Sequence, residues 1–178
     1  MELFSIVIAL VSLLVAYIVY RENAIADVVV YAQADLSRPS VINLVIHNIG
    51  KGTARDIEFI TQDGIPKGAY GISKLSDPKE VYSNGAFVTG LPILFPGERL
   101  VFSWGQFGGL KEALNNMPLE IKIIFKTKLA LQPWSQRKIN KVKIDIGSFE
   151  GISIAQPLSH TEIKDKLEQI ANAIAKLK

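Results

Sequence analysis

VINLVIHNIGKGTARDIEF, residues 41–59, contains two short apolar runs separated by a glycine-rich segment. In the first run every second residue from Ile42 to Ile46 is a large aliphatic one, and in the second Ile57 and Phe59 alternate with acidic residues. Because successive side chains of a strand point to opposite faces, each run predicts a strand with one buried face. The stretch therefore predicts two strands of a sandwich, joined at a corner formed by residues 48–53.

The corner itself, NIGKGT, has the residue types of a phosphate-binding loop in the wrong order. A P-loop requires Ser or Thr directly after its lysine, whereas Gly52 separates Lys51 from Thr53. The residues that follow continue as an alternating strand, so no helix N-terminus is expected there to hold a phosphate. We therefore expect a structural corner, in which Gly50 and Gly52 allow a positive φ or a close backbone approach.

Further apolar runs separated by turn signals lie on either side of this stretch. They predict strands within residues 25–34, 91–105, 119–128 and 138–146. A short helix ending at Asn-Asn is expected within 105–116, and both tryptophans, Trp104 and Trp134, are expected in the core. The runs show no regular alternation of strands and helices, so the sheets are predicted to be antiparallel.

NLVIHNIGKGTARDIEF, followed by LFPGERLVFSWG and LEIKIIFKTK, resembles the bacterial immunoglobulin-like domains grouped with the cell-adhesion-related domain found in bacteria. These domains show a strand, Asn-x-Gly-x-Gly-x-Ala, a second strand, and a Pro-Gly-Glu turn before the next strand. The resemblance covers residues 25–148 and implies an immunoglobulin-like β-sandwich. It implies no catalytic residue. The layout is also similar to small bacterial membrane proteins with an N-terminal anchor and a short C-terminal amphipathic helix.

Residues 3–20 form an uninterrupted run without charge. Eighteen helical residues span roughly 27 Å, close to the hydrocarbon thickness of a bilayer. Tyr17 and Tyr20 lie at the far end of the run, where aromatic rings favour the membrane interface. The sequence therefore predicts a single-pass membrane protein whose anchor occupies residues 1–22.

The alternative is a cleaved signal peptide, because Ala24-Ile25-Ala26 fits the small-x-small cleavage pattern. Against it, the preceding segment has no Lys or Arg, and the apolar run is longer than a usual signal-peptide core. Arg21 and Arg38 follow the run, whereas Glu2 precedes it. Positive-inside counting therefore favours a cytoplasmic over a periplasmic domain at the cell inner membrane.

A stripe of small residues lies on one face of this helix and is a candidate contact with another transmembrane helix. Its members are Ser5, Ala9, Ser12 and Ala16. Small side chains let helices approach closely in lipid, so the stripe favours a homo-oligomer or a protein partner.

Residues 159–178 change to a helical period. Apolar residues recur there on one helix face: Ile163, Leu167, Ile170, Ile174 and Leu177. This short heptad seam predicts a C-terminal amphipathic helix. It is expected to contact a protein partner or a second copy of the chain, or else to dock on an open face of its own sandwich. A third alternative places its lysines on lipid headgroups.

The glycine-rich stretch 63–90 is a candidate recognition loop because it carries Tyr70, Tyr82 and Phe87. Long loops on a rigid scaffold often carry recognition, and tyrosine is a favoured contact residue. The alternative is a strand and bulge whose pattern is not visible in the sequence.

Catalytic signals are sparse. Of the two histidines, His47 lies in a predicted strand and His160 begins the tail, and neither belongs to a pattern with a nucleophile. We expect no catalytic, metal or cofactor site and no small-molecule substrate, and hence no enzyme. The net charge of +3 is spread between strands, which favours a solvated surface over nucleic-acid binding.

These features predict an all-β fold. We expect an immunoglobulin-like antiparallel β-sandwich (25–150), an N-terminal transmembrane anchor (1–22) and a C-terminal amphipathic helix (159–178). The expected function is a membrane-anchored, non-enzymatic interaction or scaffold module that presents the sandwich and the tail at the membrane surface. The alternative is an exported adhesion or carbohydrate-binding module that faces the cell envelope.

Overall fold

The computed structural model describes residues 2–38, 40–70, 80–128, 134–151 and 167–170. Its strands are β1 (Val28–Ala34), β2 (Val41–Asn48), β3 (Ala54–Ile60), β4 (Leu91–Leu94), β5 (Arg99–Gln106), β6 (Leu119–Thr127) and β7 (Gln136–Ile144). Its helices are α1 (Glu2–Asn23), α2 (Ala86–Thr89), α3 (Phe107–Ala113) and the 3-10 helix η1 (Ile146–Phe149).

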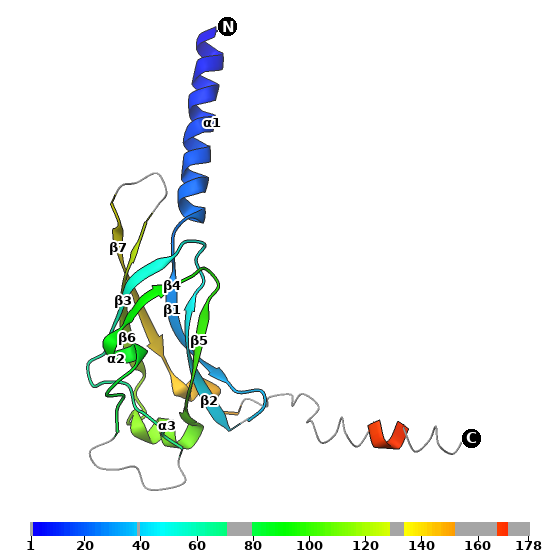
Figure 1. The fold of residues 1–178 in the computed structure, drawn as a ribbon, viewed down its shortest axis with the longest axis vertical. Helices are drawn as coiled ribbons and strands as arrows, with labels where there is room; N and C mark the ends of the chain where they lie inside the picture. The colour runs from blue at the N-terminus through cyan, green and yellow to red at the C-terminus, as the bar shows by residue number, and fades with distance from the viewer. Residues whose placement is uncertain (1, 39, 71–79, 129–133, 152–166, 171–178) are drawn as a thin grey trace.

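The strands form two antiparallel sheets, and the apolar helix α1 projects from one end of them (Figure 1). One sheet has the strand order β1-β2-β5 and the other has the order β4-β3-β6-β7. All the pairings are antiparallel. The expectation of a mainly β fold with antiparallel sheets is therefore confirmed.

Both sheets contribute to one hydrophobic core. Leu44 and Ile46 from one sheet and Ile57 and Phe125 from the other are almost completely buried in the same cluster. Trp104 fills the core as well, and its indole Nε1 donates a hydrogen bond to the carbonyl oxygen of Pro66 at 3.0 Å. A buried indole N–H needs such a partner, so this bond explains how the tryptophan fits between apolar neighbours.

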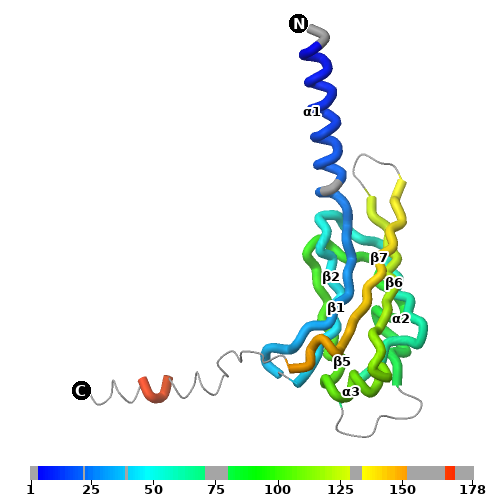
Figure 2. The backbone as a smooth tube through the Cα atoms, turned by 180° about the vertical axis from the view of Figure 1, so that it is seen from behind, coloured from blue at the N-terminus to red at the C-terminus, as the bar shows by residue number. Residues whose placement is uncertain are grey.

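The antiparallel order collects the strand connections at two opposite ends. Register pairs such as Ala54 with Leu94 and Thr127 with Gln136 place strand termini side by side at the end from which α1 leaves. This helix-side end consists of the linker 24–27, the connections 49–53 and 95–98, and residues 128 and 134–135 next to β6 and β7. The connection 107–118 and the described residues between β1 and β2 lie at the opposite end, which we call the far end (Figures 1 and 2).

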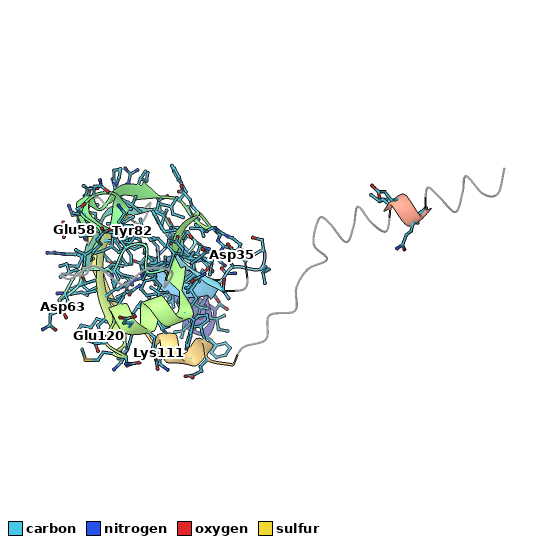
Figure 3. All side chains as sticks on the ribbon, turned by 90° about the horizontal axis from the view of Figure 1, so that it is seen from below. Asp35, Glu58, Asp63, Tyr82, Lys111 and Glu120 are labelled. Carbon is cyan, nitrogen blue, oxygen red and sulfur yellow. The ribbon has the colours of Figure 1, made fainter. Side chains whose placement is uncertain are left out.

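The far end carries α3 and η1, whereas α2 lies beside β3 partway along the sheets (Figure 1). Seen from that end, α3 lies across the open ends of the strands, with Lys111, Asp63 and Glu120 around it (Figure 3). Lys111 Nζ lies 3.2 Å from the Glu150 carboxylate, which joins α3 to the segment after η1. The described chain therefore leaves the sheets at the end opposite to α1.

Several local predictions are confirmed. The helix within 105–116 is α3, which ends at Ala113. Asn115 and Asn116 follow it in the turn, and their φ angles of 52° and 55° lie in the left-handed region that asparagine tolerates. The predicted run 91–105 is divided by a turn at Gly97 (φ 73°) into β4 and β5, which belong to different sheets. The first strand begins at Val28, because residues 25–27 bond to the glycine-rich corner instead.

One core prediction is wrong. Trp134 is 63% exposed, in contrast to Trp104, which is fully buried. The physical reason is position: Trp104 lies in phase with the inward side chains of β5, whereas Trp134 lies in the connection before β7, where no sheet face covers it. Residues 167–170 are helical, and the rest of the predicted C-terminal helix lies outside the described residues.

Candidate functional site

The apolar helix α1 is joined to the sheets at its C-terminal end. Its most apolar stretch, Phe4–Arg21, has no buried residue and is long and apolar enough to cross a membrane. Its large side chains are 37–72% exposed. What holds the helix to the sheets is therefore the linker that follows it, residues 24–27.

The glycine-rich corner holds that linker by backbone hydrogen bonds. The Ile49 N–H donates to the Asp27 carbonyl at 2.8 Å. The N–H groups of Lys51 and Gly52 both donate to the Ile25 carbonyl at 3.1 Å. The corner therefore continues the pairing of β1 with β2 beyond the strands and extends it to the end of α1.

Asn48 is the central side chain of this contact, and it is completely buried. Its Oδ1 accepts hydrogen bonds from the N–H groups of Asp27 (3.1 Å) and Gly50 (3.2 Å). Its Nδ2 donates to the carbonyls of Gly52 (2.8 Å) and Leu94 (3.1 Å). Two donors meet the oxygen and two acceptors meet the nitrogen, so all the polar capacity of the amide is used.

The two glycines of the corner are required by close backbone approach. A Cβ atom at Gly50 would lie 2.3 Å from the amide nitrogen of Asp27. A Cβ atom at Gly52 would lie 2.1 Å from the carbonyl oxygen of Ala24. Neither residue has a positive φ, so of the two reasons that favour glycine at a corner, only the steric one applies here.

The second sheet holds the same linker from the other side. The Ala26 N–H donates to Thr127 Oγ1 at 3.2 Å in a buried position. Asn140 Nδ2 donates to Asp27 Oδ1 at 2.7 Å and to the Val28 carbonyl at 2.8 Å. We call Asn48, Gly50, Gly52, Thr127 and Asn140 the clasp. Because the clasp draws on both sheets, the linker is fixed rather than hinged.

A cavity of about 480 Å³ lies beside the clasp. Asn23 at the end of α1 and Lys138 on β7 both line it. Across the same junction, Lys51 Nζ donates to Asn23 Oδ1 at 2.5 Å. Side chains from the corner and from β7 therefore lie beside the end of α1.

The small-residue stripe predicted on α1 is exposed along its whole length. Its members, Ser5, Ala9, Ser12 and Ala16, are all accessible. The Ser12 hydroxyl donates to the Ile8 carbonyl of its own helix at 2.9 Å, so its hydrogen bonding is satisfied without a neighbour. The contact role of the stripe stays a prediction.

The predicted recognition loop divides between surface and core. The Tyr70 hydroxyl lies 2.9 Å from Ser103 Oγ, in an exposed position over β5. Phe87 is only 6% exposed and packs on Phe102, with ring centroids 4.9 Å apart. Tyr82 packs on Phe87 at 5.6 Å, and burial raises the pKa of its hydroxyl. Phe87 is thus a core residue, which corrects its placement in a recognition loop; α2, which carries it, is too short for the sequence pattern to predict.

The two described members of the tail seam are accessible: Leu167 is 61% exposed and Ile170 is 56% exposed. The other three, Ile163, Ile174 and Leu177, lie outside the described residues. His160 lies outside them as well. His47 Nδ1 lies 3.4 Å from the Tyr31 hydroxyl, as a cross-strand packing partner. Within the described ranges, no group of three or more acidic, histidine or cysteine side chains is placed to hold a metal ion.

Sequence reasoning identified the corner but not its partner. The Asn-x-Gly-x-Gly pattern indicated a tight turn, yet it contained no signal that the turn binds the linker after α1. Thr127 and Asn140 lie 101 and 113 residues from their partners. No local pattern could have revealed them, because each appears only as an ordinary polar residue of an alternating strand.

Replacing Thr127 by valine tests the contribution of the second sheet. The change keeps the shape of the side chain but leaves the buried Ala26 N–H without its acceptor, so the free energy of unfolding should fall by about 1–3 kcal/mol. Denaturant unfolding of the full chain in mild detergent measures it. Thr89→Val is the matched control, because its hydroxyl bonds to Gly85 in an exposed position. Equal effects of the two variants would contradict the role of Thr127.

Comparison with known proteins gives one finding beyond the geometry. No curated protein and no solved structure matches the chain. The model of a family described as Domain of unknown function (DUF8453) matches residues 1–150. This range takes in α1, the linker, the clasp and both sheets up to η1. The apolar helix and the sheets are therefore parts of one family unit, and the chain belongs to the DUF8453 family.

Proposed function

We propose that this protein is a membrane-anchored, non-enzymatic interaction or scaffold module. In this proposal α1 crosses the membrane, the clasp fixes the β body to the end of α1, and the far-end loops and the tail meet a partner. The observation that carries the proposal is the linker 24–27, which bonds to both sheets at the base of an exposed apolar helix. A fixed linker sets the direction of the loops relative to the membrane.

The strand order supports an immunoglobulin-like sandwich as the rigid body. In the constant-type immunoglobulin fold, strands A, B, E and D form one sheet and strands C, F and G form the other. Lettered in chain order, the present sheets are A-B-E and D-C-F-G. The one difference is the fourth strand, which pairs with β3 rather than with β5, and related sandwiches vary in this way.

The clasp also supports an anchor that is retained. Cleavage after Ala26 would remove Ile25, whose carbonyl accepts two of the hydrogen bonds from the corner. It would also remove the Ala26 N–H that Thr127 accepts. The N–H groups of Lys51 and Gly52 and the buried Thr127 hydroxyl would lose their partners, so the body is more stable with the helix attached. The bonds of the linker therefore favour a transmembrane anchor over a signal peptide.

The orientation that we propose places the body in the cytoplasm, at the inner membrane. A reporter enzyme fused after Lys178 tests this directly. Activity on the cytoplasmic side is the expected result. Activity outside the cytoplasm would contradict the orientation and favour the exported adhesion module instead.

The interaction role is tested by photo-crosslinking from the far end in intact cells. Met117 lies at that end and is 60% exposed. A photoreactive residue at this position should give a discrete adduct, and the same residue at Ile139, which is 52% exposed on the outer face of β7, serves as the control. Retention of the protein after alkaline extraction of membranes is the accompanying test of the anchor. Release by alkali, or adducts that do not depend on position, would contradict the proposal.

The tail provides a separate prediction. Leu167 and Ile170 are exposed apolar residues on the same helical turn. The double variant Leu167→Asp and Ile170→Asp should reduce self-association in detergent, because buried carboxylates would oppose contact between two seams. Sedimentation should show a shift towards the monomer. Sedimentation identical to that of the unmodified chain would contradict association through the tail.

A further inference from the structure

The helix-side end exposes three large apolar side chains on three separate connections. Ile49, Phe95 and Trp134 are 55%, 56% and 63% exposed. They belong to the connections after β2, after β4 and before β7. An exposed apolar residue alone needs no explanation, but these three occur at the same end as the exposed apolar helix α1.

The same end also carries an excess of positive charge. Lys51, Lys128 and Arg137 are exposed there, and Lys138 is half-buried beside Asn23. In the part of the chain that the structure describes, none of these four has a carboxylate within ion-pair distance. Their charges are therefore available to an anionic partner.

The acidic side chains of the helix-side end are engaged within the protein. The Asp27 carboxylate accepts from Asn140 at 2.7 Å, and the Asp56 carboxylate pairs with Lys126 at 2.9 Å. The Glu98 carboxylate accepts from the Phe95 N–H at 2.8 Å. Hydrogen bonds from neutral groups leave the charges of Asp27 and Glu98 in place. The basic side chains described at this end nevertheless outnumber these three acids: Lys51, Lys126, Lys128, Arg137 and Lys138. The end therefore presents a net positive charge.

The ends of β6 and β7 lie level with the last turn of α1 (Figures 1 and 2). Lys138 lines the same cavity as Asn23, the last residue of α1. β7 begins at Gln136 and runs away from α1, so Trp134, four residues before Lys138, lies further towards the start of the helix. At about 3.3 Å per residue the chain can carry Trp134 up to roughly 13 Å beyond Lys138. That distance reaches the level of Tyr20, three residues or about 4.5 Å up the helix.

We propose that the helix-side end of the body binds the anionic headgroup layer of the membrane that α1 crosses. Trp134 is the main interfacial contact, with Phe95 and Ile49 beside it, and Lys128 and Arg137 lie against lipid phosphates. Indole rings favour the interface because one part is apolar and the N–H is polar, and juxtamembrane lysines and arginines are attracted to anionic lipids. This inference rests on the proposed function, because it requires α1 in the bilayer.

Two features of the helix-side end favour the membrane as its partner. Its positive charge complements anionic headgroups, and it lies next to α1. A lipid surface is the partner that α1 brings to this end in every copy of the protein. It matches an end where exposed apolar and basic side chains lie on the connections next to an apolar helix. A second copy of the chain would present the same positive charge, which opposes a symmetric contact at this end.

The experiment uses the full chain in lipid nanodiscs and records tryptophan fluorescence. The chain has two tryptophans, of which Trp104 is in the core and Trp134 is exposed. Lipids with brominated acyl chains near the headgroup should quench part of the emission in discs that contain phosphatidylglycerol. Trp134→Phe should abolish this quenching. Lys128→Glu with Arg137→Glu should reduce it by about half, because the electrostatic attraction is reversed.

The matched control lies on the same strand. Lys141→Glu with Lys143→Glu reverses two charges of β7 towards the far end, and it should leave the quenching unchanged. Alkaline extraction of the same discs reports separately on α1. Retained protein without quenching of Trp134 would overturn the membrane contact and leave the anchor intact, whereas released protein would overturn the proposed function. Equal quenching in zwitterionic discs would also overturn the contact with anionic lipid. So would a change of Trp134 emission in lipid-free detergent that equals the change seen in the discs.

Discussion

Replacing Asn48 by alanine is expected to lower the free energy of unfolding by about 3–5 kcal/mol, because four backbone groups lose their partner and an unpaired buried group costs roughly 1–3 kcal/mol. The bonds lost are those to Asp27, Gly50, Gly52 and Leu94. Three of the four bonds are part-buried and only the bond to Leu94 is fully buried, so water can replace some of them, which keeps the sum below its upper limit. Denaturant unfolding of the full chain in mild detergent, followed by the emission of the buried Trp104, measures the change.

Two further variants separate the hydrogen bonds of Asn48 from its volume. Asn48→Asp keeps the shape but cannot donate to the carbonyls of Gly52 and Leu94, so it should also be strongly destabilising. Asn43→Ala removes the same side chain from a half-buried position on the same strand, and should change the stability by less than about 1 kcal/mol. An Asn48→Ala variant as stable as Asn43→Ala would contradict the clasp.

Replacing Gly52 by alanine is the second large effect. The added methyl group would lie 2.1 Å from the carbonyl oxygen of Ala24 and 2.8 Å from the amide nitrogen of Ala26. Both neighbours are backbone atoms, so the linker itself must move away from the corner. We expect a loss of about 3 kcal/mol, from overpacking and from the broken bonds to the Ile25 carbonyl. Faster hydrogen exchange at the amides of Lys51 and Ala26 should accompany the loss.

In the matched control, Gly108→Ala, the free energy of unfolding is expected to change in the opposite direction. A Cβ atom at Gly108 would meet nothing within 4 Å, and Gly108 lies in α3 without a positive φ. Gly108→Ala should therefore raise the stability by about 0.5–1 kcal/mol, because alanine is the better helix former. A Gly52→Ala variant with unchanged stability and unchanged exchange at Lys51 would show that the linker does not lie against the corner.

The fold was predictable where the sequence shows a clear alternation. Strands β2, β3, β6 and β7 lie within two residues of the predicted runs, because apolar and polar residues alternate along each, although Val45 in β2 and Ile124 in β6 are buried on the second face as well. The turn at Gly97 was visible in the Pro-Gly-Glu motif, whereas the placement of β4 and β5 in different sheets was not. What could not be predicted was the partner of each strand, since pairing depends on residues far apart in the chain.

The candidate site was predictable only in part, for a similar reason. Gly50 and Gly52 indicate that the backbone is crowded, but the crowding atoms belong to residues 24–27, which have the composition of a strand start. Phe87 and Trp134 were both predicted at the wrong depth: Phe87 was expected on the surface and is buried, and Trp134 was expected in the core and is exposed. An aromatic residue in a loop can be core or surface, and only the packing of the sheets decides: Phe87 is covered by Phe102, whereas Trp134 extends past the end of the sheets.

If α1 crosses the membrane as proposed, the physical consequence of the clasp is a restricted angle between α1 and the body. A flexible linker would let the far-end loops sample many heights and directions above the membrane, whereas a bonded linker restricts them to one. If the helix-side end also contacts lipid, the body is held at two places, the end of α1 and Trp134. Two attachment points remove the remaining rotation about the helix axis, and the far-end loops then face one direction.

The distance between α1 and the body shows whether the clasp holds α1 at one angle to the sheets. The chain contains no cysteine, so Leu14→Cys and Glu58→Cys give two unique spin-label sites, both exposed. The labelled chain is placed in nanodiscs with an excess of unlabelled chain, which suppresses distances between copies, and pulsed electron paramagnetic resonance records the distance distribution. If the clasp fixes the linker, the distribution of distances between the two labels is narrow in the unmodified chain, and Gly52→Ala broadens it. A broad distribution in the unmodified chain, like that of a free tether, would contradict it.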